Sequence, residues 1–156
     1  MPSLAAALLT LSMGAHASDA LKTAFTAEDI AGVVTNKGHA NQIEIDSTGD
    51  PIISARNPLI AHDYQILFYN CHAGQCGAIQ IRAWFKHTAP ISAEQINAWN
   101  STQTFGRVFL DKDGDPNLDV FIYAHSGVTM SYVSSELTCF LKVMRDFRAE
   151  LAGSIE

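Results

Sequence analysis

Residues 90–125 read PISAEQINAWNSTQTFGRVFLDKDGDPNLDVFIYAH, and this stretch predicts a short helix followed by a β-hairpin. Ser92 and Gln95 have the spacing of a capping box, in which each side chain accepts a hydrogen bond from the backbone N–H of the other residue. The helix is therefore expected to begin directly after Ser92. Ile96 and Trp99 lie three residues apart, so they share the face that would pack against a sheet.

The hairpin that follows has two β-rich segments joined by an acidic turn. Its strands are expected from Phe105 to Leu110 and from Leu118 to Ala124. Between them, DKDGDP at 111–116 supplies a glycine for positive φ and aspartates that can accept hydrogen bonds from turn N–H groups. Alternation divides the second strand between two faces, with Leu118, Val120 and Ile122 on one and Asp119, Phe121 and Tyr123 on the other.

The N-terminal half predicts one helix and four more strands. Thr26 fits the N-cap of a helix whose apolar stripe contains Ile30, Val33 and Val34. The turn IDSTGDP at 45–51 has the same chemistry as residues 110–116, which we interpret as convergence, with internal duplication as the alternative. The strands are expected at 41–46, 52–55, 64–69 and 77–85, with Ile43 and Ile45 on one face of the first.

The C-terminal segment predicts a long amphipathic helix from the N-cap Thr129 to about Leu151. One interpretation is that its apolar stripe packs on the protein's own sheet, and the other is that part of it forms a partner or homodimer surface. Cys139 lies off the stripe and is expected to be buried, with pairing between chains as the alternative. The stripe consists of Met130, Val133, Leu137, Phe140, Met144, Phe147 and Leu151.

Together these elements predict an α+β fold with three helices on a twisted, mostly antiparallel sheet, in the order α-β-β-β-β-α-β-β-α. The 156 residues, 47% of them hydrophobic, fit one domain, expected over residues 18–156. Residues 1–17 fit a secretory signal peptide, with an apolar run too short to cross a bilayer and a small-x-small cleavage pattern at 15–17. No basic residue precedes that run, so a buried N-terminal helix and a start further upstream are the alternatives.

Export would place the mature domain in the periplasm or outside the cell, with no membrane insertion after cleavage. The net charge of −6 and the absence of any Lys/Arg cluster argue against binding to nucleic acids or anionic membranes. In an oxidising compartment, Cys71 and Cys76 flank a hairpin loop and are expected to form a disulfide. A zinc site that includes His72 is the alternative, although no fourth ligand is evident.

The acidic turn at 111–116 begins like a calcium-binding loop. The positions that an EF-hand fills with Gly and a bidentate Glu are occupied by Pro116 and Ile122, so a solvated turn is expected, with weak calcium binding as the alternative. The best catalytic candidate is His125 with Ser126, but adjacent strand residues face opposite ways. We therefore expect a protein that is not an enzyme and has no catalytic residue, cofactor or resident metal.

A set of distinctive residues begins at Trp99. It consists of Trp99, Asn100, Phe105, Arg107, Asp111, Gly114 and Asp115, followed by Ser126-Gly127-Val128-Thr129 at the start of the last helix. On these residues the chain resembles the YbjN family, over roughly Thr26 to Leu151. The resemblance implies a fold similar to that of type III secretion chaperones and a bacterial protein of the kind described as sensory transduction regulators. It supplies no agreed catalytic set.

These observations predict a non-catalytic, exported interaction domain with a chaperone-like or regulatory role. It would bind a protein partner or a second copy of itself through the sheet face and the last helix. Trp84, Phe121 and Tyr123 are the candidate exposed aromatic residues, whereas Trp99 is expected to anchor its helix in the core. The alternative is an extracytoplasmic protein that binds a small molecule or envelope component in a pocket between sheet and helices.

Overall fold

A computed structural model describes residues 19–151, so the predicted signal segment at 1–17 lies outside the described residues. Within this range the elements follow the predicted order and form an α+β fold. The helices are α1 (Ala27–Asn36), α2 (Ala93–Thr102) and α3 (Met130–Glu150). The strands are β1 (Ala40–Ile45), β2 (Pro51–Asn57), β3 (His62–His72), β4 (Gln75–Trp84), β5 (Arg107–Leu110) and β6 (Pro116–Tyr123).

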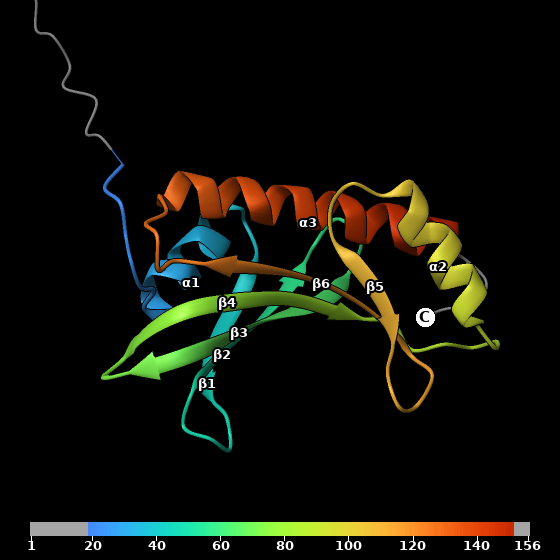
Figure 1. Cartoon of the computed structure of the whole chain (residues 1–156), viewed down its shortest axis with the longest axis horizontal. Coiled ribbons are helices and arrows are strands. Elements are labelled where there is room, and N and C mark those ends of the chain that lie inside the picture. Colours follow the sequence, from blue (N-terminus) through green and yellow to red (C-terminus); the bar gives the residue numbers. More distant parts are fainter. Residues whose placement is uncertain (1–18, 152–156) are drawn as a thin grey trace, which may run out of the picture.

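The strands form one antiparallel sheet in the order β1-β2-β3-β4-β6-β5. Helices α1 and α3 lie together across one face of this sheet, and α2 lies beside β5 at one end (Figure 1). In the described part of the chain, the opposite face carries no helix, and we call it the open face. The sheet therefore offers one side to the core and leaves the other side available.

All three helices begin at the residues that the sequence predicts. The side chains of Thr26 and Thr129 each accept a hydrogen bond from a backbone N–H three residues later, over 3.1 Å. Ser92 and Gln95 form the complete capping box, with hydrogen bonds of 2.8 and 3.2 Å. A side-chain cap satisfies N–H groups that have no partner inside the helix, and each is typically worth about 1 kcal/mol.

The hydrophobic core lies between the sheet and the helices α1 and α3. Ile53, Ile79 and Leu118 point into it from the strands, and each is fully buried. Trp99 is half-buried and its ring packs edge-on against Phe147 at 5.2 Å, which confirms its role as an anchor for α2.

The apolar stripe of α3 is part of this core. Five of its side chains, Val133, Leu137, Phe140, Met144 and Phe147, are buried in the described fold, while Met130 is partly buried. The chain's own sheet and helices already cover these five side chains. A partner surface in this fold must therefore use other residues.

The segment before α1 ties the N-terminal part of the domain to the rest. The backbone of Lys22 exchanges two hydrogen bonds with Val128, at 2.8 and 2.9 Å, and Phe25 exchanges two with Cys76. The Asp19 carboxylate accepts from the N–H groups of Met130 and Ser131 at the start of α3. The pKa of Asp19 is lowered, first by a hydrogen bond with the Ser131 side chain and then by the hydrogen bonds from these backbone N–H groups.

The two acidic hairpin turns have the same geometry. The carboxylates of Asp46 and Asp111 each accept from the backbone N–H groups two and four residues later, at 2.7–3.0 Å. In both turns a glycine follows, Gly49 with φ 93° and Gly114 with φ 84°. The predicted likeness of the two turns is thus confirmed as a shared hydrogen-bond pattern.

Ile43 and Ile45 share the helix side of the edge strand β1, as expected, and both are exposed. The burial of Cys139 and several strand boundaries differ from the expectation. Cys139 is exposed as a free thiol rather than buried, since it lies about 100° around the helix from Phe140. The strand β5 starts two residues late because Gly106, with φ 75°, breaks the extended conformation.

Candidate binding surface

Three aromatic side chains, which we call the aromatic row, lie along the open face of β3 and β6. They are Tyr69, Phe121 and Tyr123, and all three are exposed. The ring of Phe121 lies 5.9 Å from that of Tyr69 and 6.2 Å from that of Tyr123. The predicted exposure of Phe121 and Tyr123 is confirmed. Since exposed aromatic rings carry a large apolar area with little conformational freedom, such a row is typical of contact surfaces.

A buried polar chain, which we call the Asp119 network, borders the aromatic row. Tyr69 donates its hydroxyl hydrogen to Gln80 Oε1 at 2.7 Å, and Gln80 Nε2 donates to Asp119 Oδ2 at 2.7 Å. Gln80 is 6% and Asp119 3% exposed, although both lie on the open face. Arg107 completes the chain by donating to both carboxylate oxygens, at 2.9 and 3.3 Å.

Arg107 compensates the charge of the buried carboxylate. Its own pKa is raised by the hydrogen bonds and the charge of Asp119. The pKa of Tyr69 is also raised, chiefly by burial, so its hydroxyl stays protonated and keeps donating to Gln80. A buried carboxylate with these partners gives the face a fixed arrangement of donors and acceptors.

A second set of contacts links the open face to the acidic turn of β5 and β6. Arg82 donates twice to Asn117 Oδ1, at 2.8 and 2.6 Å, and Asn117 Nδ2 donates to Asp111 and to the carbonyl oxygen of Asp115. The guanidinium groups of Arg82 and Arg107 lie 5.5 and 5.4 Å from the centre of the Phe109 ring. The turn and the face thus hold each other in place.

A shallow hollow of about 440 Å³ lies on the same face, toward the other edge of the sheet. Its walls include Gln42, Ser54, Gln65 and the exposed Trp84, so the predicted exposure of Trp84 is confirmed. An ion pair between Arg56 and Asp63, at 2.6 Å, lines it as well. The open face therefore combines an aromatic region with a polar, grooved region.

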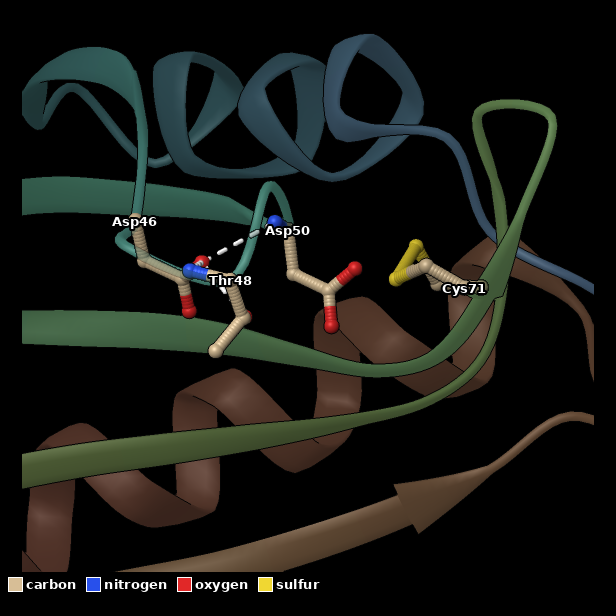
Figure 2. Close-up of a disulfide and its surroundings, with 5 residues drawn as sticks. Asp46, Thr48, Asp50 and Cys71 are labelled. Atoms are coloured by element: carbon tan, nitrogen blue, oxygen red, sulfur yellow. Dashed lines mark hydrogen bonds between the residues drawn. A yellow bond between two sulfur atoms is a disulfide. The ribbon is translucent and has the colours of Figure 1, made fainter.

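A disulfide joins Cys71 and Cys76 at the tip of the β3–β4 hairpin, as the sequence predicts. Figure 2 shows this disulfide together with the turn that contains Asp46 and Asp50. The strand register explains why they are neighbours, because β1 and β2 join next to the end of β3. The disulfide thus stabilises the end of the sheet beside the aromatic row.

The residues that carry the family resemblance hold α2, β5 and β6 together. The Asn100 side chain donates to the carbonyl oxygen of Val108 at 2.8 Å and accepts from its N–H at 2.9 Å. The amide thus forms with the edge strand β5 the pair of hydrogen bonds that the backbone of a neighbouring strand would form. Asp115 accepts two hydrogen bonds from His87, at 2.9 and 2.6 Å, which fasten the loop after β4 to the turn. Phe105 packs against the core.

Three observations concern the residues that the structure describes. Among residues 19–151, no three His, Cys, Asp or Glu side chains come together as a metal site. His125 and Ser126 are both exposed beyond the end of β6, and no hydrogen bond joins their side chains in this range. No helix between residues 19 and 151 has the length and apolar character needed to span a membrane.

A scan against protein-family models matches residues 19–153 to the YbjN model, whose description is "Putative bacterial sensory transduction regulator". The chain belongs to the YbjN family. The YbjN match spans the whole described fold, including the N-terminal helix and the hairpins, in which the sequence contains few distinctive residues. A search of curated proteins finds no match to this chain.

The sequence alone did not identify Gln80, Tyr69 or the burial of Asp119. One signal for Asp119 was present, since a charged residue in the middle of an apolar strand needs a partner when buried. Alternation placed Asp119 on the open face, but only the register shows that Arg107 lies directly opposite it.

Proposed function

We propose that this YbjN protein is a non-catalytic interaction domain that binds a protein partner through the open face of its sheet, in a regulatory or chaperone-like role. The observation that carries this proposal is the aromatic row of Tyr69, Phe121 and Tyr123, which is exposed on a face without a covering helix. Proteins seldom leave several neighbouring aromatic rings exposed unless something binds them.

The partner that suits this face is a protein segment with apolar side chains. Its apolar groups would pack on the aromatic row, and its polar groups would meet the side chain of Arg107, 64% of which is accessible. Because the Asp119 network fixes that guanidinium, a bound segment would lose little affinity to ordering the surface. The five buried side chains of the α3 stripe take no part.

The same proposal includes export to the periplasm or the cell exterior. The Cys71–Cys76 disulfide supports this location, because disulfides persist in oxidising compartments and are rare in the cytoplasm. The segment 1–17, which fits a signal peptide by its sequence, supports it as well.

The test is capture from cell-envelope extract with the tagged full chain, followed by identification of the retained proteins. Changing Phe121 and Tyr123 together to Ser should abolish retention of the specific partner, because both rings would be lost from the row. Tyr132→Ser is the matched control, since Tyr132 is also exposed but lies on α3. Equal retention by the two variants would contradict the proposal.

A further inference from the structure

A cavity of about 330 Å³ lies on the helix side of the molecule, away from the open face. It is bounded by the end of α1, the turn between β2 and β3, and the middle of α3, and we call it the α1–α3 pocket. Its polar lining consists of Lys37, His39, Asn57, Thr138, Lys142 and Arg145. Arg148 donates to the carbonyl oxygen of Ile60 in the β2–β3 turn, which holds this wall against α3.

The hydrogen bonds of His39 determine what it presents to the pocket. His39 is 6% exposed, and its Nδ1 lies 2.8 Å from the hydroxyl of Tyr64, which is fully buried. Among the described residues this hydroxyl has no other hydrogen-bond acceptor, so it donates its hydrogen to Nδ1. The neutral imidazole then carries its hydrogen on Nε2. That N–H has no partner in residues 19–151, and His39 is one of the residues that line the pocket.

The protonation state agrees with this tautomer. Burial, with a smaller contribution from the positive charge of Lys37, lowers the pKa of His39 below its ordinary value of 6.5. The ring is therefore neutral at neutral pH, and it presents one N–H donor to the pocket.

Asn57 presents donors as well. It is 4% exposed, and its Oδ1 accepts from the N–H of Leu59 at 3.0 Å. This contact assigns the oxygen of the amide, which leaves the Nδ2 group with two hydrogens. No acceptor for them occurs within the described range, and Asn57 also lines the pocket. Two side chains that are more than nine-tenths buried thus keep donors without a protein acceptor. These donor atoms reach solvent, because no fully buried side-chain nitrogen or oxygen in the described range lacks a partner.

The charges around the α1–α3 pocket are mostly positive. Lys37 donates to Thr138 at 2.7 Å, and no carboxylate pairs with it among residues 19–151. Lys142 and Arg145 share a single carboxylate, that of Asp146, at 2.6 and 3.0 Å. Three cations and one carboxylate leave an excess of positive charge, although the whole chain carries −6.

We infer that the α1–α3 pocket binds a small organic anion, whose carboxylate or phosphate oxygens accept from His39 and Asn57 and whose body packs against the apolar part of the wall. That apolar part is formed by Leu59, Ile60 and Leu141. The cavity has the size of a typical small-ligand site, with a few convergent polar groups in an apolar surround. This inference goes beyond the proposed function, because it concerns a second site on the other side of the sheet.

The test uses benzoate, phenyl phosphate and the uncharged benzamide as probes with the uniformly ¹⁵N-labelled full chain. A long-range ¹H–¹⁵N spectrum of the histidine rings, assigned with His39→Gln, should show His39 with its hydrogen on Nε2. At least one anion should shift the His39 and Asn57 side-chain signals in a saturable way, and benzamide should not. Whichever anion binds more tightly identifies the headgroup.

Variants show whether the charges act at this site. Arg145→Ala and Lys142→Ala should each weaken anion binding about tenfold, the factor expected when a charged hydrogen-bond donor is lost. Lys112→Ala is the control, since Lys112 is an exposed cation in the turn between β5 and β6. A hydrogen on Nδ1 of His39, equal shifts with benzamide, no saturable shift with either anion, or equal effects of all three variants would each overturn the inference.

Discussion

Replacing Arg107 with alanine tests how the open face is stabilised. The change removes both hydrogen bonds to Asp119, which is 3% exposed and, among residues 19–151, keeps the Gln80 amide as its remaining side-chain partner. Breaking a fully buried ion pair costs about 3–5 kcal/mol. Because 64% of the Arg107 side chain is accessible, water can enter the vacated space, so we expect a smaller loss of unfolding free energy, about 2–3 kcal/mol.

Urea denaturation followed by circular dichroism measures this loss, and the melting temperature should fall by roughly 10 °C. Arg56→Ala is the matched control, because Arg56 pairs with Asp63 on the same face with both side chains more than half exposed. Such a pair is worth less than about 1 kcal/mol. In a double-mutant cycle, Asp119→Asn should recover part of the cost of Arg107→Ala, since no unpaired charge then remains. Equal losses for Arg107→Ala and Arg56→Ala would refute the proposed role of the Asp119 network.

Four further outcomes are expected. Gly114→Ala should lower the unfolding free energy by about 1–2 kcal/mol, because Gly114 has a φ of 84°. Gly32→Ala, in the middle of α1 with no atom near the added carbon, should raise it by about 0.5–1 kcal/mol. Thermal melts of the two variants measure this difference. Replacing Cys71 and Cys76 with Ala should lower the unfolding free energy by about 2 kcal/mol. Thiol counting on the denatured, non-reduced parent protein should find Cys139 alone, and three thiols would exclude the disulfide. Phe147→Ala should lower the unfolding free energy by about 3–5 kcal/mol, because Phe147 is fully buried. Leu59→Ala, at an exposed position, should change it by less than about 0.5 kcal/mol. Similar losses for the two variants would contradict the burial of the α3 stripe. Hydrogen bonds from His87 lower the pKa of Asp115 below its ordinary value of 3.8. The stability that the Asp115 carboxylate contributes is therefore present above pH 3.8 and lost as the pH falls through the folded-state pKa. The urea midpoints at about pH 5.5 and about pH 2.5 should differ less for Asp115→Asn than for the parent protein.

Most of the fold could be predicted because its local signals agree with one another. The caps at Thr26, Ser92 and Thr129 fixed the helix starts, and the spacing of apolar residues in α3 identified its buried side. Strand ends were less certain, because Gly106 interrupts an otherwise continuous β pattern through its positive φ.

The features that could not be predicted from the sequence depend on packing between distant segments. Alternation places Ile43 on one face of β1 but does not say whether it is buried, because its exposure depends on how far the helices extend over this strand. The α1–α3 pocket unites Lys37, His39 and Asn57 with residues on α3, about a hundred positions later in the chain. No local sequence pattern predicts that these distant residues lie together, whereas the exposure of Phe121 and Tyr123 on β6 follows from simple alternation.

Crosslinking in living cells tests most directly whether the open face contacts a protein partner. We would place a photoreactive phenylalanine at Phe121 in one full-length variant and at Tyr132 in another, irradiate living cells and analyse the adducts. We expect a defined protein adduct from position 121 on the open face and none of the same mass from position 132 on α3. The same adduct from both positions, or none from position 121 in a correctly folded protein, would contradict this expectation.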